Sequence, residues 1–318
     1  MSITVVGSIA FDSVETPFGQ RDRMLGGAAT HFALAASLLD QVRLVGPVGD
    51  DFGDAELAVL STRETNIDDV ERVAGGKTFF WKGKYGWDLN TRETLDTQLN
   101  VFEHFSPKLS EASRASDVLF LANIQPGLQL QVRRQCEAAK FVALDSMNLW
   151  IDIARDELLA IIGQVDCLML NDEELRQLTG KPNLISAAHE ILNWGPPAGP
   201  PAPSMVVAKQ GEYGSALITK DDFFALPAYP LHTVVDPTGA GDTFAGGFVG
   251  FIARHLGGRL SGDVLRNAMA YGTALASFNV ERFGTEGLES VQAPAVHERV
   301  ADLDRFARFD PIAFELIA

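Results

Sequence analysis

The residues best suited to chemistry lie in one short stretch, V234-V-D-P-T-G-A-G-D-T-F-A-G-G-F-V-G250. Its two β-branched residues, Val234 and Val235, predict the end of a buried strand, which Pro237 stops. The apolar stripe that follows predicts a helix from Thr243 to Leu256. The stretch is therefore expected to form a strand, a tight turn and a helix N-terminus.

The predicted turn is suited to binding an anion. Gly239 and Gly241 carry no side chains that would block the approach of a ligand. The amides of Ala240, Gly241 and Asp242 are first-turn donors without partners inside the helix, at the positive end of its dipole. A carboxylate at Asp242 would repel an anion, so we interpret it as a general base that faces a hydroxyl beside a phosphate. Taken singly, each residue is more typical of a helix cap or a backbone turn.

The run D236-P-T-G-A-G-D-T-F244 matches throughout the signature D-x-x-G-A-G-D-x-F of the PfkB or ribokinase-like family of small-molecule kinases. The chain resembles this family over residues 3–290. The resemblance implies an α/β protein with a ribokinase-like three-layer αβα fold, a mainly parallel central sheet and a small β lid. It also implies an ATP-dependent phosphotransferase with Asp242 as base and an anion hole at Gly239, Ala240 and Gly241. The acceptor would be a hydroxyl of a small sugar or polyol.

Two alternative functions stay open. One is a nucleoside kinase of the same family with an adenosine-like acceptor. The other is a regulator that binds a sugar and a nucleotide without turnover, and the intact Asp242, Gly239 and Gly241 argue against it. Gly180 and Lys181 are followed by proline, which excludes a P-loop, and the absence of Gly-x-Gly-x-x-Gly removes the basis for a dinucleotide-binding oxidoreductase.

Composition narrows the class of protein. The chain has 318 residues, 46% of them hydrophobic, and a formal net charge of −16, which argues against a nucleic-acid or anionic-membrane partner. Its two cysteines, Cys136 and Cys167, predict buried free thiols in a reducing compartment. No apolar run approaches the roughly 18 residues of a membrane span. We expect a cytoplasmic protein with one domain over residues 1–318.

Apolar runs along the chain predict a parallel sheet. They begin with Ile3–Ile9 and Val42–Val45, and three later runs, at 118–124, 141–148 and 167–174, each finish in polar residues. Ligands of open α/β sheets bind beyond the carboxyl ends of the strands. One candidate site is therefore expected to gather the polar residues that end these runs: Asn123, Asp145, Asn148, Asn171 and Glu174.

The segment N171-D-E-E174 matches the N-x-x-E motif of the family, which implies a place near magnesium and the phosphates. Mg²⁺ prefers oxygen ligands and keeps several waters, so Glu174 could act through water. The alternative is a capping box, in which Asn171 is the first residue of a helix cap and the Glu174 side chain bonds back to the backbone of Asn171. Both roles could coexist.

The resemblance places the acceptor near the N-terminus. Asp12 follows the first predicted strand and would bind acceptor hydroxyls together with Asn123 and the backbone of Gly26 and Gly27. A helix is predicted from Ala28 to Leu39. Ribokinase-type members carry Asn where this chain has His31, so imidazole would make that contact. A partly exposed structural His is the alternative.

The resemblance assigns the nucleotide and cation sites to C-terminal residues. Gly211 matches a nucleotide-binding glycine, and Lys209 stands where the family has Thr, offering the triphosphate a cation. Thr238 would also contact the nucleotide, and Thr273, on a helix predicted over 265–279, would lie near the adenine. V280-E-R-F-G284 resembles the family's V-x-R-x-G segment. Where members bind a monovalent cation such as K⁺, residues equivalent to Asp236, Thr238 and Gly284 contribute, partly through backbone oxygens.

Residues 76–105 break the alternation of strands and helices. They are extended, aromatic and rich in turns, which predicts a small antiparallel β-element. The resemblance implies that this element and residues 11–24 form a lid over the substrate, and sometimes a homodimer contact. Core packing is the favoured role for most of the aromatic residues Phe79, Phe80, Trp81, Tyr85 and Trp87. The proline-rich insert 195–204 is expected to be a surface loop.

Overall fold

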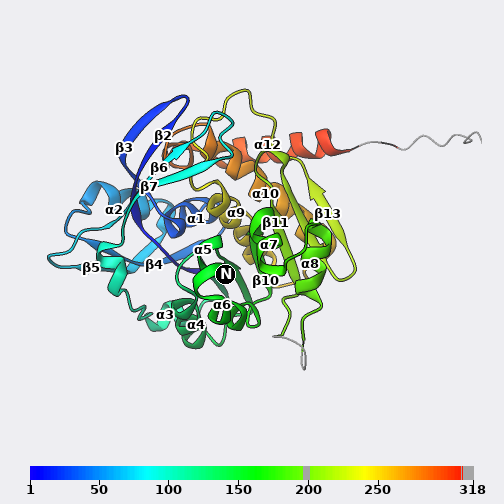
Figure 1. The fold of residues 1–318 in the computed structure, drawn as a ribbon, viewed down its shortest axis with the longest axis horizontal. Coiled ribbons are helices and arrows are strands. Elements are labelled where there is room, and N and C mark those ends of the chain that lie inside the picture. The colour runs from blue at the N-terminus through cyan, green and yellow to red at the C-terminus, as the bar shows by residue number, and fades with distance from the viewer. Residues whose placement is uncertain (196–200, 309, 311–318) are drawn as a thin grey trace, which may run out of the picture.

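The computed structural model describes residues 1–195, 201–308 and 310. Its largest element is a nine-stranded central sheet (Figure 1). The strands are β1 Ser2–Val6, β4 Gln41–Gly49, β5 Asn66–Val73, β8 Val118–Leu121, β9 Phe141–Asp145, β10 Cys167–Asn171, β11 Met205–Lys209, β12 Ser215–Thr219 and β13 Phe223–Leu226. Their spatial order is β13-β12-β11-β10-β9-β8-β1-β4-β5. Only β12 and β13 run antiparallel to their neighbours.

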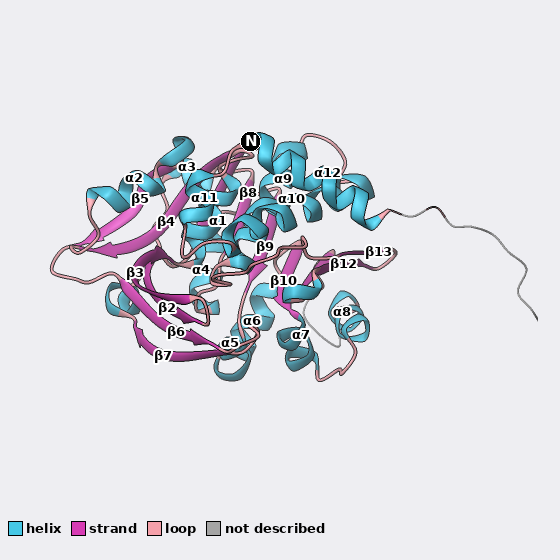
Figure 2. Ribbon diagram, turned by 90° about the horizontal axis from the view of Figure 1, so that it is seen from above, coloured by secondary structure: helices cyan, strands magenta, loops and turns pink. Residues whose placement is uncertain are grey.

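Helices cover both faces of this sheet, because its strands are apolar on both sides. The helices are α1 Ala28–Ala36, α2 Asp54–Leu60, α3 Glu111–Arg114, α4 Pro126–Gln135, α5 Asn148–Ile153, α6 Arg155–Ile162, α7 Asp172–Thr179, α8 Leu184–Leu192, α9 Ala240–His255, α10 Gly262–Val280, α11 Glu286–Ser290 and α12 Ala293–Ala307. Short 3₁₀ turns span 62–64, 100–104 and 211–213. One face packs against α1, α9 and α10, and the other against α4, α6, α7 and α8 (Figure 2). The predicted three-layer αβα class with a mainly parallel sheet is confirmed.

A second sheet stands beside the first. It contains β2 Ala10–Thr16, β3 Gly19–Gly26, β6 Phe79–Tyr85 and β7 Arg92–Gln98, in the order β3-β2-β6-β7. The antiparallel element predicted over residues 76–105 is confirmed as the β6–β7 pair, and β2 joins this pair by running parallel to β6. Strands β2 and β6 belong to two separate excursions of the chain, so no hairpin imposes an antiparallel pairing on them.

Two predicted strands differ in the structure. The first ends at Val6 instead of Ile9, and Asp12 therefore lies on β2 of the small sheet. Val234 and Val235 form no strand: the segment is an extended loop whose Val235 amide donates to the Val280 carbonyl at 2.7 Å. The β-branched pair favours extended backbone, but its neighbour here is the end of α10 and not another strand.

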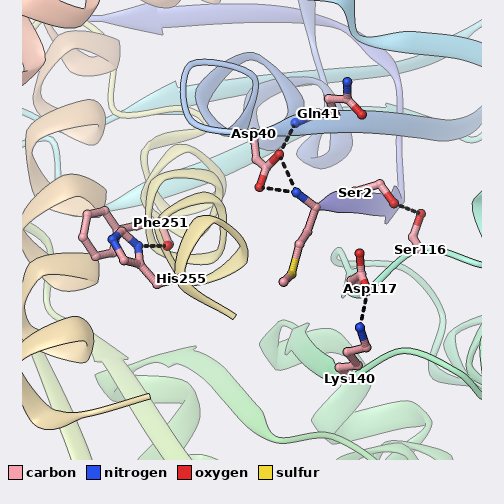
Figure 3. Close-up of polar contacts among 9 residues, drawn as sticks. Ser2, Asp40, Gln41, Ser116, Asp117, Lys140, Phe251 and His255 are labelled. Atoms are coloured by element: carbon pink, nitrogen blue, oxygen red, sulfur yellow. Dashed lines mark hydrogen bonds and ion pairs between the residues drawn. The ribbon is translucent and has the colours of Figure 1, made fainter. Parts of the chain in front are cut away.

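Two acidic residues at the amino edge of the central sheet are paired with other groups of the same chain (Figure 3). The amino group of Met1 lies 3.1 Å from an Asp40 carboxylate oxygen, and the Gln41 amide donates to the same side chain at 2.8 Å. Lys140 pairs with Asp117 at 2.7 Å. The acids in this view have their partners within the chain.

Three further observations bear on the sequence expectations. Cys136 and Cys167 are buried free thiols, as predicted. Among the described residues, we find no helix that combines the length and the apolar character needed to cross a bilayer. Part of the proline-rich insert, residues 196–200, lies outside the described residues.

Candidate active site

The glycine-rich turn sits at the start of α9. Gly239 has a φ of 73°, in the left-handed region that glycine adopts without strain, and α9 begins at Ala240. A Cβ on Gly239 would collide with the buried ring of His31. The Ala240 amide donates to the Pro237 carbonyl at 3.2 Å, so it is partly used within the turn. The Gly241 amide is the first-turn donor left for an anion, and the Asp242 amide lies against its own carboxylate.

Asp242 lies in that first turn and is half-buried. Burial raises the pKa of its carboxyl group, and the nearby charge of Asp145 raises it further, while Lys209 and Arg92 lower it. A carboxylate with a raised pKa is a better proton acceptor than one exposed to water. The position and the electrostatics of Asp242 therefore suit a general base.

Lys209 ends β11 and brings a positive charge to the same place. Its Nζ lies 2.6 Å from Asp145 Oδ2, at the end of β9. A Cβ on Gly241 would lie 3.1 Å from that Nζ, so the missing side chain leaves room for the ammonium group against the turn. Burial lowers the pKa of Lys209, but the charges of Asp145, Glu174 and Asp242 raise it by more, so the pKa lies above its ordinary value. Lys209 is thus a charged group held at the anion-binding turn.

Asn171 and Glu174 form the capping box that was the alternative to a magnesium role. Asn171 Oδ1 accepts from the Glu174 amide at 2.7 Å, and Glu174 Oε2 accepts from the Asn171 amide at 2.8 Å. Burial raises the pKa of Glu174 to about 7. Its Oε1 has no part in the cap, so a second role toward a cation stays compatible with the geometry.

The oxygen donors at this edge fit magnesium. Within the described ranges, no three His, Cys, Asp or Glu side chains are grouped so as to hold a metal ion by themselves. Mg²⁺ is usually bound by one or two carboxylates together with waters and substrate phosphates. Glu174 would supply that carboxylate contact through its Oε1, directly or through water. Bound Mg²⁺ would neutralise charge on the phosphates.

Asp12 reaches the site from the small sheet. A Cβ on Gly26, the neighbouring strand's residue, would collide with its carboxylate, and Gly27, with a φ of 98°, caps α1. Burial raises the pKa of Asp12 to about 7, with Asp236 and Asp242 adding to the rise. Asp12 of the small sheet is therefore near enough to Asp236 and Asp242 for their charges to act on it.

The loop before the turn is held by backbone donors and by two buried side chains. Asp236 Oδ1 accepts from the Thr238 amide at 2.9 Å, and its Oδ2 accepts from the Gly284 amide at 3.0 Å. His31 Nδ1 lies 3.0 Å from Asn279 Oδ1, and Asn279 Nδ2 donates to the Thr238 carbonyl at 2.8 Å. His31 is 1% exposed, so the alternative of a partly exposed His was wrong. Its ring is enclosed between α1 and the turn of α9.

Of two residues of the small sheet at this loop, sequence reasoning named Tyr85 only among the lid aromatics and missed Arg92. Tyr85, at the end of β6, accepts a hydrogen bond from the Thr238 hydroxyl at 3.2 Å. Arg92 lies opposite Tyr85 in the β6–β7 ladder, and its charge lowers the pKa of both Asp242 and Glu174. Directly opposed residues share one face of a sheet, so Arg92 faces the turn with Tyr85. A single Arg after a hairpin turn carries no motif, and only the strand register shows its position.

The tip of the small sheet also contacts the predicted nucleotide side. Asn90 Nδ2 donates to Glu212 Oε1 at 2.9 Å, and Gly211 lies beside the Asn90 side chain. Asn123 is at the expected edge, where its Oδ1 accepts from Trp150 Nε1 at 2.9 Å. Thr273 lies buried in α10.

The aromatic residues of the small sheet have different roles. Phe79 packs against Phe102 with the two rings tilted, and Phe80 packs against the core, as predicted. Tyr85 is buried at the catalytic loop. Core packing was wrong for Trp87, which is 88% exposed because it lies in the turn between β6 and β7.

A cavity of about 610 Å³ lies at the other end of α9, away from these carboxylates. Its lining includes Arg63, Phe251, Tyr271 and His297, and its carboxylate, Asp40, is paired with the Met1 amino group. Because it holds no unpaired base beside an anion-binding turn, we do not assign the chemistry to it.

Comparison with known proteins agrees with this geometry. A family model described as pfkB family carbohydrate kinase matches residues 3–291. A cytidine kinase of Thermococcus kodakarensis is 29% identical over 261 residues, 80% of this chain and 89% of that protein. A nucleoside kinase of Methanothermobacter thermautotrophicus is 25% identical over 89% of this chain and 91% of its own. A solved structure described as a putative ribokinase II from E. coli with ATP and Mg²⁺ has a TM-score of 0.76 at 18% identity, covering 95% and 99% of the two chains.

The fold of the described residues has the ribokinase-like architecture. The chain belongs to the pfkB family of carbohydrate kinases. Its relatives include nucleoside kinases as well as a ribokinase.

Proposed function

We propose that the protein transfers the γ-phosphoryl group of ATP to a hydroxyl of a small molecule, with Asp242 as the general base. The observation that carries this proposal is the juxtaposition of Asp242, the free Gly241 amide of its turn and Lys209. A base, an anion hole and a cation at one helix N-terminus are the parts that phosphoryl transfer needs.

In this mechanism Asp242 accepts the proton of the attacking hydroxyl. The Gly241 amide donates a hydrogen bond to the transferred phosphoryl group, and Lys209 and Arg92 balance the charge on it. Glu174 and Asn171 would hold Mg²⁺ near the phosphates, and Gly211, Thr238 and Thr273 would contact ATP. The small sheet acts as the lid, and its Tyr85 and Asn90 contacts hold it over the site.

For the acceptor we propose a nucleoside, with a free sugar or polyol as the second candidate. Asp12 and Trp81 are register partners on β2 and β6, so their side chains share the face that looks toward the turn. Asp12 would bind ribose hydroxyls, helped by Gly26, Gly27 and Asn123, while the indole offers the base a flat surface. The nucleoside kinases among the relatives also favour this acceptor.

A panel of nucleosides, ribose, fructose and inositols assayed for ADP release tests the acceptor class. We expect the best nucleoside to exceed ribose in kcat/KM by at least tenfold, and Trp81→Leu to reduce that ratio. A free sugar that outperforms every nucleoside would contradict the nucleoside assignment.

Replacing Asp12 separates acceptor binding from nucleotide binding. A hydrogen bond to a charged group is worth about 1.5–3 kcal/mol, so Asp12→Ala should weaken acceptor binding at least tenfold and hardly change ATP binding. Calorimetric titration with each ligand measures both. Equal loss of both ligands would indicate a folding defect, and an unchanged acceptor affinity would remove Asp12 from the site.

A further inference from the structure

The loop before the catalytic turn is where the family resemblance implies a monovalent cation, bound partly by backbone oxygens. In this chain the Thr238 carbonyl already accepts from Asn279 Nδ2 at 2.8 Å. Each carboxylate oxygen of Asp236 accepts a backbone amide hydrogen, from Thr238 or Gly284. The oxygens that would face a cation therefore have internal donors.

The orientation of the Asn279 amide follows from its second partner. His31 Nδ1 lies 3.0 Å from Asn279 Oδ1, and both residues are buried, with exposures of 1% and 0%. Because an amide oxygen can only accept, the hydrogen must lie on His31 Nδ1, and the Asn279 amino group must point at Thr238. Burial lowers the pKa of His31 to about 4, so the ring is neutral and keeps this arrangement at physiological pH.

His31 also supports the turn directly. The space that a Cβ on Gly239 would occupy is filled by the imidazole ring, which lies against the left-handed glycine. The same ring therefore contacts the turn on one side and orients Asn279 on another. Together the two side chains connect α1, α10 and the catalytic loop.

We propose that the Asn279 amide, oriented by His31, takes the structural place of the monovalent cation, so that the catalytic turn forms and works without K⁺. A cation drawn to the Thr238 carbonyl would meet the partly positive amide hydrogens of Asn279, so these residues do not fit K⁺ as bound in the family. His31 and Asn279 are positioning residues in this scheme. The proposal rests on the proposed kinase function for its activity readout and on the fold alone for its binding readout.

The test compares KCl, NaCl and tetramethylammonium chloride at equal ionic strength. For the wild type we expect kcat/KM and the ATP affinity measured by calorimetry to differ less than twofold among the salts. Its melting temperature should differ by less than about a degree. For Asn279→Ala we expect at least a tenfold loss of ATP affinity in tetramethylammonium chloride and recovery with K⁺, which can then reach the freed carbonyl.

Asn267→Ala is the matched control, because Asn267 lies on the same helix and its exposed side chain donates only to the Asp263 carbonyl. It should behave as the wild type in every salt. His31→Phe keeps the ring but removes the donor to Asn279, and should acquire a weaker K⁺ dependence. It gives a second test if Asn279→Ala fails to fold.

A wild-type protein activated tenfold or more by K⁺ would overturn the proposal without recourse to any variant. Equal behaviour of Asn279→Ala and wild type in all salts would overturn it as well. If no acceptor is phosphorylated, the proposed function fails, while the salt dependence of ATP binding and melting still decides the role of Asn279.

Discussion

Acidic residues at the two edges of the central sheet differ in their charged partners and in the direction of their pKa shifts. At the amino edge Asp40 pairs with the Met1 amino group and the Gln41 amide, and Asp117 pairs with Lys140. At the carboxyl edge and the turn beside it, Asp145, Glu174 and Asp242 lie around one half-buried cation, Lys209, and Asp12 lies near Asp242. The contact with Lys140 lowers the pKa of Asp117, whereas burial raises the pKa of Asp12 and Glu174 to about 7.

This difference separates a structural edge from a functional one. Paired surface acids contribute little and need no ligand. Unbalanced carboxylates in a buried place cost stability unless they are protonated or meet a cation brought by a ligand. Sites that cost stability in this way are typical of catalytic centres. The following predictions test this contrast.

The largest effect is expected from Asp242→Asn. The change removes the proton acceptor but keeps the shape of the first turn of α9, so turnover should fall by roughly 10² or more while ATP still binds. Steady-state kinetics and calorimetry measure the two quantities. Asp117→Asn, at the other edge, is the control and should keep full turnover. Near-native turnover in folded Asp242→Asn would remove Asp242 as the base.

An intermediate effect is expected from Glu174→Gln. Glutamine can still accept from the Asn171 amide, so the capping box and the melting temperature should persist. The Mg²⁺ concentration for half-maximal activity should rise about tenfold, because supporting ligands of a metal typically contribute that much. EDTA should abolish the activity of the wild type and of Glu174→Gln, and Mg²⁺ should restore it. An unchanged Mg²⁺ titration would leave Asn171 and Glu174 as helix caps alone.

The smallest effect concerns stability, and its sign differs between the edges. Asp12 has a folded-state pKa of about 7, above its ordinary value of 3.8, so its charge costs stability, and this cost is fully present above pH 7. Asp12→Asn should therefore raise the melting temperature at pH 8 by a few degrees, and the gain should shrink as pH falls from 7 toward 4.

Asp117 provides the opposite sign. Its pKa is lowered in the folded state, so its charge adds stability above the unfolded pKa, and this is lost as pH falls. Asp117→Asn should lower the melting temperature slightly at pH 8 and have no effect near pH 3. Thermal unfolding at pH 4, 6 and 8 measures both variants. A destabilised Asp12→Asn at pH 8 would contradict the view of Asp12 as an uncompensated charge.

Several features could be predicted because neighbouring residues decide them. The glycine run and the helix after it depend on backbone freedom and apolar spacing, and the capping box needs only Asn171 and Glu174 three residues apart. Alternating apolar runs were sufficient to predict the parallel sheet and its helical layers. The extended Val234–Val235 segment shows the limit, since β propensity is local but strand pairing needs a partner.

The sequence by itself therefore determined the class of fold and the glycine-rich turn that carries Asp242, the base we propose. Tertiary structure alone decided that Arg92 and Tyr85 face that turn, that Lys209 pairs with Asp145, and that His31 is buried against Asn279. These contacts join residues far apart in the chain, and packing and strand register select them. The spacing of residues in the sequence does not indicate these contacts, because they form and stabilise the protein only after the layers have assembled.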